Sequence, residues 1–440
     1  MSLPAALTWA YLFPTDTAFV GDVPEPLQAP LAGWGDPASG RRVLVSWGQP
    51  ASALPDLAEY AGLVAVNPVG LSPARLAADG FGWVRSFAVV PSLGNPRLFV
   101  PLESGAVASA AFILYTPYRA SARLLYAGVR LAARSGLAGW YRDRVILARR
   151  ETPELERIAA ALFPSRAPRL AVSSGPLGPD TRRKPAIVAL DPAGRPLAYG
   201  KIPGSTVSRG YVENEAATLP ALAERFGDAW RGPRLLFAGT ADGTYLTLQS
   251  PVSGRPPGPE LTSAHLRFLN SLGGGTLTPA TATTMYRALA AHGAQIPDVG
   301  RALERVEPVL HGTLVPATIA HGDFLPWNLR LERDEIVAFD WENATLDGLP
   351  LFDELNHRLL TGNLVQQWSV DRGLGALHAV VARAPLGLRA EQVHGLAAVY
   401  LAEVLARLLD LGHGEDHELV AWYRELLSRV VASIPQAVPA

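Results

Sequence analysis

The chain has 440 residues, of which 48% are hydrophobic and 18% are charged, with a formal net charge of -1 and no cysteine. This length suffices for two or three folded cores, and the balanced charge offers no basic surface of the kind that nucleic-acid binding needs. The lack of cysteine excludes disulfides, thiolate metal sites and a cysteine nucleophile. We therefore expect a soluble, multidomain protein with no nucleic-acid partner.

Residues 1–160 are predicted to form a separate α/β module. Short apolar runs bounded by turn residues predict strands at 42–47, 63–67, 87–90 and 97–101, with a short helix at 54–60. Residues 119–150 mix apolar side chains with arginines, which favours a pair of amphipathic helices broken near Gly136 or Gly139. These arginines form either a solvated helix face or a patch for an anionic substrate or a membrane surface.

The start of the chain does not read as a targeting or membrane segment. The first 13 residues are apolar but carry no positive side chain, and Pro14 and Asp16 interrupt them, so they make a poor signal peptide. The uncharged stretch 106–115 is too short to cross a bilayer. We expect a cytoplasmic protein without stable membrane insertion.

Residues 161–255 are predicted to form a small lobe of five strands and one helix. The strands are expected at 170–174, 186–191, 196–202, 233–239 and 244–249, with a proline-bearing turn at 175–179. Lys201 lies on the third strand and is one of only two lysines, the other being Lys184. An ammonium group retained among so many arginines indicates a specific role. Glu213 and Glu215 follow in a segment of good helix formers, and the apolar spacing does not distinguish between them.

Residues 256–440 are predicted to be mainly helical. The helices are expected at 259–272, 279–292, 299–310, 351–360, 373–383, 390–411 and 418–434. Apolar residues of the segment 390–411 recur at intervals of three and four, as a packed helix requires.

The most informative stretch, residues 320–342, interrupts this helical pattern. It begins Ala-His-Gly-Asp-Phe-Leu-Pro-Trp-Asn-Leu-Arg and, after a charged turn at 333–335, continues Ile-Val-Ala-Phe-Asp-Trp-Glu. The pattern predicts a loop and two strands, with Asp323 and Asn328 five apart in the loop and Asp340 after the second strand. A carboxylate near a hydroxyl, with an amide oxygen and a second carboxylate facing Mg²⁺, supplies the parts of a phosphoryl-transfer site.

Residues His321-Gly322-Asp323, Asn328 and Asp340-Trp341-Glu342 resemble the core motif of the aminoglycoside phosphotransferase and choline kinase family, small-molecule relatives of protein kinases. The resemblance covers residues 170–360 well and the last helices loosely. It implies an α+β, protein-kinase-like two-lobe fold, with a five-stranded N-lobe at 161–255 and a mainly helical C-lobe at 256–440. The module 1–160 lies outside the resemblance and precedes this fold.

The resemblance also implies roles for single residues of the loop and its surroundings. Asp323 would be the catalytic base that orients the acceptor hydroxyl, and Asn328 and Asp340 would hold Mg²⁺. Asp353 would brace the loop from a following helix, and His321 would shape the loop rather than move protons.

Nucleotide binding is assigned by the same resemblance. Lys201, paired with Glu215, would contact the phosphates of ATP, and the segment containing Gln249, Pro251 and Val252 would take the adenine edge. The turn at 175–179 departs from the serine- or glycine-rich phosphate loop of the family, which leaves the choice between ATP and GTP open.

The implied function is an ATP- and Mg²⁺-dependent kinase that phosphorylates a hydroxyl of a small molecule. The sequence His-Gly-Asp-Phe-Leu-Pro-Trp-Asn is similar to members encoded with surface-polysaccharide enzymes, which favours a sugar or sugar-like alcohol. One alternative is a nucleotide-binding pseudokinase that acts as a protein-interaction module. Another is an aminoglycoside- or choline-type kinase, whose cationic acceptor would want an acidic or aromatic pocket in the last helices. The acids available there are Asp410, Glu415, Asp416 and Glu418. The oligomeric state is left open.

The module 1–160 is expected to act as a lid or docking domain that helps select the acceptor. Only the short proline-bearing segment 163–168 separates it from the small lobe, so it stays close. Its arginines would suit an acceptor that bears a phosphate or another anionic group.

Overall fold

The structure is a computed structural model that describes residues 16–22, 42–114, 120–137, 141–173, 184–293 and 295–435. The chain forms two compact units, the first of residues 1–212 with 234–251 and the second of residues 213–233 with 252–440. Helix α7 (Thr206–Phe226) begins in the first unit and ends in the second. The mixed α+β class predicted from the sequence is confirmed, whereas the two-lobe arrangement stays a prediction.

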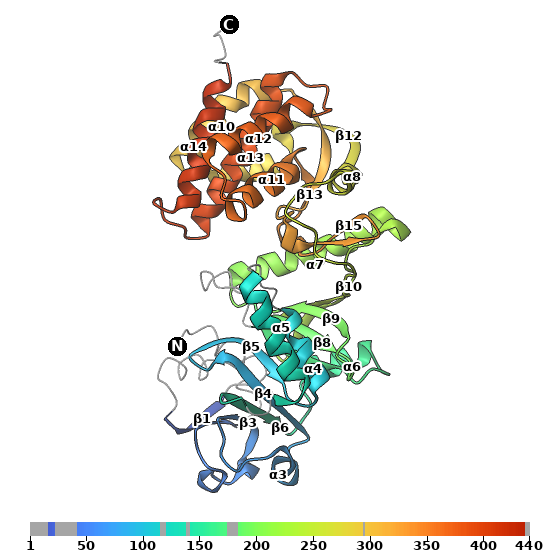
Figure 1. Ribbon diagram of the computed structural model, residues 1–440, viewed down its shortest axis with the longest axis vertical. Helices are drawn as coiled ribbons and strands as arrows, with labels where there is room; N and C mark the ends of the chain where they lie inside the picture. Colours follow the sequence, from blue (N-terminus) through green and yellow to red (C-terminus); the bar gives the residue numbers. More distant parts are fainter. Residues whose placement is uncertain are drawn as a thin grey trace. The chain divides into compact units, whose positions relative to one another are not determined.

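Within the described part of the first unit, eleven strands form one sheet, in the order β1-β2-β3-β6-β4-β5-β7-β8-β9-β11-β10 (Figure 1). The strands β1, β2 and β3 are parallel, and every other pair of neighbours is antiparallel. Their bounds are β1 (Asp16–Gly21), β2 (Arg42–Trp47), β3 (Tyr60–Val66), β4 (Trp83–Ser92), β5 (Asn95–Pro101), β6 (Arg144–Arg149), β7 (Arg169–Ser173), β8 (Ala186–Leu190), β9 (Pro196–Lys201), β10 (Leu235–Ala241) and β11 (Thr244–Gln249).

The five strands expected for the small lobe, β7 to β11, are present, and the strands before residue 160 continue the same sheet. The junction is the pairing of β5 with β7, where Leu98 faces Ser173 and Phe99 faces Val172. The core is shared as well, since Phe99 and Val172 belong to one buried cluster. The boundary expected near residue 160 therefore falls within one sheet and one core, and a division of function there stays a prediction.

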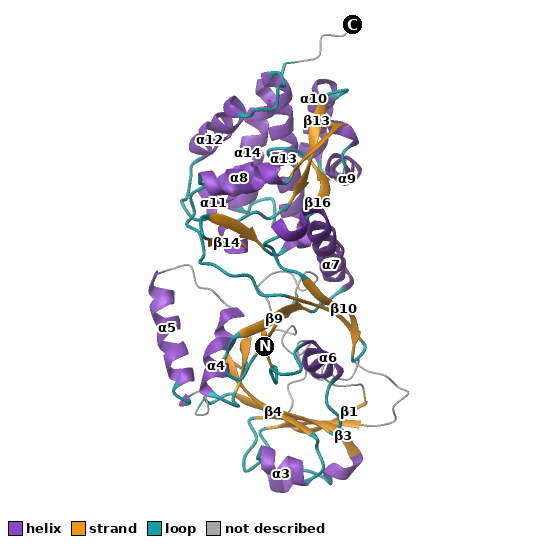
Figure 2. Ribbon diagram, turned by 90° about the vertical axis from the view of Figure 1, so that its right-hand side faces the viewer, coloured by secondary structure: helices purple, strands orange, loops and turns teal. Residues whose placement is uncertain are grey.

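Helices cover both faces of this sheet (Figure 2). Along β5, Phe99 packs in a cluster with α6 (Glu154–Leu162), whereas Leu98 and Val100 pack in another with α4 (Gly105–Ala111). Successive residues of a strand point to opposite faces, so α6 and α4 lie on opposite sides. Helix α5 (Ala120–Arg134) packs on α4, and the short α3 (Pro73–Ala78) lies near β3 and β4.

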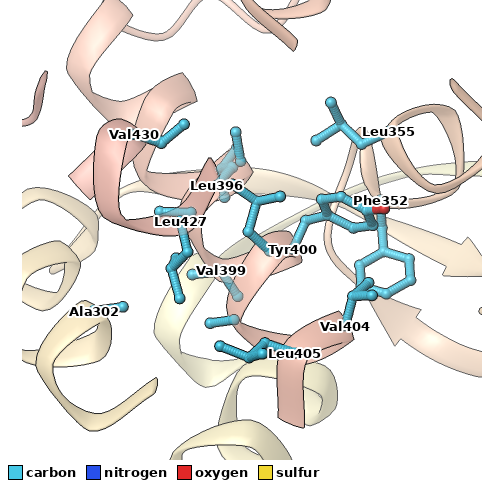
Figure 3. Packing of buried hydrophobic residues seen from close by; sticks show 14 of the residues in the cluster. Ala302, Phe352, Leu355, Leu396, Val399, Tyr400, Val404, Leu405, Leu427 and Val430 are labelled. Carbon is cyan, nitrogen blue, oxygen red and sulfur yellow. The ribbon is translucent and has the colours of Figure 1, made fainter. Parts of the chain in front are cut away.

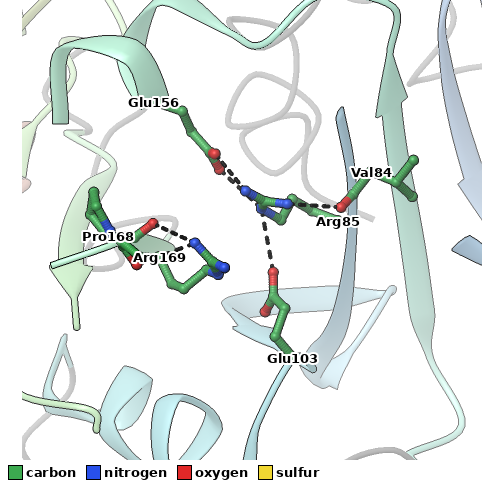
Figure 4. A network of polar contacts seen from close by, with 7 residues as sticks. Val84, Arg85, Glu103, Glu156, Pro168 and Arg169 are labelled. Carbon is green, nitrogen blue, oxygen red and sulfur yellow. Dashed lines mark hydrogen bonds and ion pairs between the residues drawn. The ribbon is translucent and has the colours of Figure 1, made fainter. Parts of the chain in front are cut away.

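A polar network links β4, the segment after β5 and helix α6 (Figure 4). The guanidinium of Arg85 donates to both carboxylate oxygens of Glu156, at 3.2 and 2.7 Å, and lies 3.4 Å from the carboxylate of Glu103. Burial raises the pKa of Glu103, and the positive charge of Arg85 opposes that rise. Because paired Arg–carboxylate bonds are strong and directional, this network fixes α6 against the sheet.

The second helix expected between residues 119 and 150 is wrong, because that part of the chain is strand β6. Val145 and Leu147 pack in one buried cluster, and Ile146 and Ala148 pack in the cluster on the other face. A central strand buried on both faces reads as a continuous apolar run without the alternation of an exposed strand. The arginines on either side of this run suggested a basic helix face.

The second unit is mainly helical and is built around α13, which Figure 3 shows among its neighbours. Tyr400 of α13 stacks edge-on against Phe352 at 5.2 Å between ring centroids and forms a 3.0 Å hydroxyl contact with Tyr423. The helices of the unit are α8 (Ser263–Ser271), α9 (Thr284–Gly293), α10 (Pro297–Leu310), α11 (Phe352–Leu364), α12 (Val370–Arg383), α13 (Ala390–Asp410) and α14 (Glu418–Ser433). All seven expected helices are confirmed, with small changes at their ends.

Of the helices that the structure describes, α13 alone has the length and apolar composition to cross a membrane. However, 72% of its most apolar 18-residue window is buried inside the second unit. Apolar residues all round a helix are what a central core position requires.

Five strands complete the second unit: β12 (Gly273–Pro279), β13 (Leu314–Ala320) and β16 (Thr345–Gly348) form one sheet, and β14 (Leu329–Glu332) and β15 (Glu335–Ala338) form a hairpin. The hairpin is predicted by the sequence, but the three-stranded sheet is not. Pro316 in the middle of β13 and the glycines of β12 hide these strands, because both residue types disfavour strand interiors.

Candidate active site

The segment 321–328, here called the acidic loop, connects β13 to the hairpin of β14 and β15. The hairpin turns at Arg333 and Asp334, which both have positive φ, as a tight turn between right-twisted strands requires. The hairpin returns the chain to the loop, where the backbone N–H of Phe339 donates to the carbonyl of Asn328 at 3.0 Å. This turn brings Asp340 back beside the acidic loop.

Asp323 and Asn328 are held together directly. The side-chain amide of Asn328 donates to the Asp323 carboxylate at 2.7 Å and to its backbone carbonyl at 2.9 Å. Asn328 is buried and Asp323 is half-buried. Because the amide nitrogen makes both bonds, the amide oxygen of Asn328 is the atom left to face a cation.

The carboxylate of Asp340 lies close enough to act electrostatically on Asp323. Burial raises the pKa of Asp323 to about 6, and the negative charge of Asp340 adds to that rise. Asp340 itself adopts the left-handed region, with φ 69 and ψ 56, at the start of the short helical turn Trp341–Asn343. Aspartate tolerates this backbone better than most residues.

His321 ties the acidic loop to the end of β15. Its Nδ1 accepts from the backbone N–H of Asp323 at 3.3 Å, and its Nε2 lies 3.0 Å from the carbonyl oxygen of Phe339. A carbonyl only accepts, so Nε2 carries the proton and donates. The ring is fully buried and packs on Trp341 at 4.5 Å. The histidine thus links the backbone at Asp323 to the backbone next to Asp340, as expected for a residue that shapes the loop.

Two charged side chains from different helices brace Gly322. The carboxylate of Asp353, on α11, accepts from the backbone N–H groups of His321 at 2.6 Å and of Gly322 at 3.0 Å. Arg407, on α13, donates to the carbonyl of Gly322. Gly322 has φ +79, and a Cβ there would lie 2.3 Å from the carbonyl oxygen of Asn343, so only glycine fits.

Replacing Asp353 by asparagine is expected to destabilise the protein by about 2 kcal/mol, because an amide presents one acceptor and a donor to two buried N–H groups. Burial raises the pKa of Asp353 to about 7, and the two backbone hydrogen bonds oppose that rise. Urea unfolding measures the effect. Asp371→Asn, at an exposed carboxylate that contacts Arg429, is the matched control. Equal stability of the two variants would contradict the bracing role of Asp353.

Phe324 anchors the acidic loop in an aromatic cluster. Its ring stacks on Phe268 of α8 at 5.6 Å and contacts His265 and His357 at 6.1 and 5.9 Å. Burial lowers the pKa of His265 to about 4 and that of His357 to about 3, so both rings are neutral at pH 7. The loop therefore rests on an uncharged surface behind Asp323.

Helix α7 clamps the segment that follows Asp340. The carboxylate of Glu215 accepts from the backbone N–H of Trp341 at 3.0 Å, and Asn214 donates to the carbonyls of Glu342 and Ala344 at 2.9 and 3.0 Å. Glu215 is 1% exposed whereas Glu213 is exposed. Of the two candidate glutamates, Glu215 is thus the one directed into the fold beside Asp340.

The other residues assigned to nucleotide binding lie mainly in the first unit, and their roles stay predictions. Lys201 ends β9, between Ala186 of β8 and Thr247 of β11. Gln249 is buried at the end of β11, and its amide oxygen has no hydrogen-bond partner among the described residues. Pro251 and Val252 follow without secondary structure. The expected turn at 175–179 lies outside the described residues.

The sequence-based assignment does not contain Asn214, Arg407 or the residues that pack on Phe324, which are His265, Phe268 and His357. For Arg407 a signal existed, since Glu403 and Arg407 are charged residues one turn apart in the stretch 395–409, which is otherwise apolar. Such a pair in a core helix indicates a buried polar task. Asn214 and Phe268 carry no such signal, because their contacts depend on tertiary packing.

Neither a family model nor a curated protein matches the chain. Several solved structures are similar to it at low identity. A thermostable mutant of an aminoglycoside phosphotransferase, in a ternary complex with ADP and hygromycin B, has 14% identity and a TM-score of 0.43, with 64% of this chain and 100% of that chain covered. A choline/ethanolamine kinase family protein from Mesorhizobium loti has 18% identity and a TM-score of 0.39, with 63% and 93% covered. An ethanolamine kinase from Plasmodium vivax has 10% identity and a TM-score of 0.43, with 74% and 93% covered. Values this low leave the reaction to be inferred from the residues of the site itself.

The donor set of the site fits Mg²⁺. The amide oxygen of Asn328 and the carboxylate of Asp340 are hard oxygen ligands. No group of three or more His, Asp or Glu side chains suited to a metal gathers in the parts of the chain that the structure describes. Two protein ligands are nevertheless enough for Mg²⁺, which usually keeps several waters and binds substrate phosphates at the same time.

Proposed function

We propose that this protein is an ATP- and Mg²⁺-dependent phosphotransferase that phosphorylates a hydroxyl group of a small molecule. The observation that carries the proposal is the bond from the Asn328 amide to the Asp323 carboxylate, with Asp340 beside them. In this arrangement the Asp323 carboxylate is suited to an acceptor hydroxyl. The amide oxygen of Asn328 and the carboxylate of Asp340 are suited to a cation. This division of labour matches the requirements of phosphoryl transfer.

In the proposed reaction, the acceptor oxygen forms a bond to the γ-phosphorus as the bond from that phosphorus to the β,γ-bridging oxygen breaks, and ADP leaves. The carboxylate of Asp323 accepts the proton of the acceptor hydroxyl late in the transfer. Asn328 keeps that carboxylate in one orientation, and Asp353 and Arg407 keep the loop beneath it in place. Most of the rate gain comes from positioning and electrostatics.

Lys201 and Glu215 serve the nucleotide in this proposal, with Lys201 steadying its phosphates. Mg²⁺, when bound to Asn328 and Asp340, would neutralise charge on the phosphates. The buried amide oxygen of Gln249 supplies an acceptor for an N–H group of the base, which supports placing the adenine edge at residues 249–252.

A sugar or sugar-like alcohol is the acceptor that we favour over a cationic one. The positive charge of Arg407 acts on Asp323 and partly offsets the negative charges of Asp340 and Glu342, which act on it as well. Two of the four acids named for an aminoglycoside- or choline-type kinase are engaged elsewhere, since Asp410 contacts His292 and Glu415 contacts Arg424. Both acids are at least partly exposed to solvent.

An ADP-release assay with Mg²⁺ and ATP, run against matched panels of neutral polyols, anionic sugars and cationic amino sugars, tests the proposal. We expect acceptor-dependent ADP release with a hydroxylated neutral or anionic compound. Binding of ATP and Mg²⁺ without turnover on any acceptor would instead support the pseudokinase alternative. Turnover confined to amino sugars or choline would overturn the assigned acceptor class while retaining the chemistry.

The turnover rate is expected to rise with pH through about 6 and to level off above it. A general base works only when ionised, and burial raises the pKa of Asp323 to about 6, so activity is lost as the pH falls through that value. A profile of kcat/KM against pH, recorded at saturating ATP and Mg²⁺, measures the midpoint. An acidic limb centred near pH 4 would show that Asp323 titrates as an ordinary carboxylate and is not the buried base.

A further inference from the structure

Helix α5 of the first unit turns large apolar side chains toward solvent. Leu124 is 77% exposed, Leu125 72% and Leu131 69%, with Val129 at 37%. Leu124 and Leu131 are about two helical turns apart and therefore lie on one stripe of the helix. Contiguous apolar patches on a protein surface mark interaction sites.

The packing of α5 shows that these leucines face away from the core. Tyr126 and Ala133 fix the helix against α4: Ala133 is 3% exposed, and the Tyr126 ring meets Phe112 edge-on at 5.8 Å. Leu124 precedes Tyr126 by two residues, and Leu131 precedes Ala133 by two residues. At 3.6 residues per turn, two residues correspond to a rotation of about 200° around the helix. They therefore lie nearly opposite the side that packs on α4, which Figure 2 shows beside α5.

The charge of this region is of one sign. From Ser104 to Arg142 the sequence contains no aspartate or glutamate, and it contains five arginines: Arg119, Arg123, Arg130, Arg134 and Arg142. Arg130 and Arg134 are exposed and one helical turn apart. In a chain with a net charge of -1, this segment is positively charged, and the exposed Arg130 and Arg134 complement an anionic partner.

We propose that α5 docks this protein reversibly on an anionic lipid bilayer. The helix would lie in the plane of the interface, with Leu124 and Leu131 among the acyl chains and Arg130 and Arg134 at the headgroups. Leucines on one face and arginines on its flank are the composition of interfacial helices. The fifteen residues extend about 22 Å, too short to span the bilayer.

The same features disfavour a second copy of this chain as the occupant. Two copies meeting through their α5 leucines would also bring their arginine flanks together, and like charges across an interface are unfavourable. An anionic headgroup instead pairs with each arginine while the leucines leave water. Both the apolar face and its positive flank are then satisfied by one partner.

Sedimentation of the full-length protein with vesicles tests this docking. We expect binding to vesicles that mix phosphatidylcholine with the anionic lipid phosphatidylglycerol, and little binding to pure phosphatidylcholine. The double variant Leu124→Ser, Leu131→Ser should lower the bound fraction at least tenfold, since two buried side chains are lost (about tenfold or more for each leucine). Arg130→Gln with Arg134→Gln should weaken only the anionic-vesicle binding, by roughly tenfold, and salt should weaken it further.

The matched control is the double variant Leu277→Ser, Leu314→Ser, which removes two leucines that are 59% and 50% exposed in the second unit. It should bind vesicles like the parent, and circular dichroism should show that all variants are folded. Absence of binding to anionic vesicles overturns the proposal, as does equal binding by the α5 variant. A parent dimer in light scattering that the α5 leucine variant converts to a monomer would assign the face to a second copy instead.

Discussion

Replacing Asp323 by asparagine is expected to lower turnover by about 10²–10⁴-fold, the range for loss of a general base. Asparagine keeps the size of the side chain and still accepts the bond from Asn328, so the loop should keep its shape. Nucleotide affinity should therefore be nearly unchanged. Single-turnover rates and ATP titrations on the same preparation separate the two quantities.

Asp334→Asn is the matched control for this substitution. Asp334 lies in the exposed hairpin turn a few residues further on, with φ 66, a conformation that asparagine adopts readily. Its turnover should equal that of the parent protein. If Asp323→Asn and Asp334→Asn both turn over at the parental rate, Asp323 is not the base.

Replacing Lys201 by arginine is expected to lower kcat/KM by about 10²-fold or more, although the charge is kept, since a planar guanidinium does not replace a compact ammonium at a phosphate. Of the 39 lysine and arginine residues in the chain, only two are lysines. An arginine at position 201 would match the rest of the chain, so the lysine there indicates a specific requirement. Steady-state kinetics with varied ATP measures the effect.

Lys184→Arg provides the control, because it makes the same chemical change at the other lysine, whose ammonium lies 4.8 Å from the ring centre of Tyr211. A guanidinium also stacks on an aromatic ring, so this variant should stay active. Parental kinetics for Lys201→Arg would remove Lys201 from the phosphate site.

The helices of the second unit could be predicted from the sequence because their cores are local patterns. In α13 the apolar spacing of three and four identifies the helix without knowledge of its partners. Strand β6 could not be predicted in this way, since its buried run lacks alternation and only its neighbours β3 and β4 explain it. The pairing of β5 with β7 is likewise long-range, so the continuous sheet was not expected.

The loop of the candidate site was accessible from the sequence because its glycine, proline and acids stand at fixed spacings. The contacts of Asp353 with the backbone N–H groups of His321 and Gly322 agree with the expected brace, whereas the bond between Asn328 and Asp323 was not predicted. Arg407 could not be placed in the same way, because it comes from a helix 85 positions away and contacts Gly322 only after the core has packed. The side chains that hold the site are thus less visible in the sequence than those proposed to do its chemistry.

The most direct test of the proposed function is transfer of label from γ-³²P-ATP to the small molecules of a cell extract, compared between the parent protein and Asp323→Asn. This design does not require the acceptor to be known in advance. We predict a labelled, phosphatase-sensitive small molecule that forms with the parent protein and Mg²⁺ and is strongly reduced with Asp323→Asn. A parent protein that binds ATP and Mg²⁺ but labels no small molecule beyond the level of Asp323→Asn would contradict the kinase assignment.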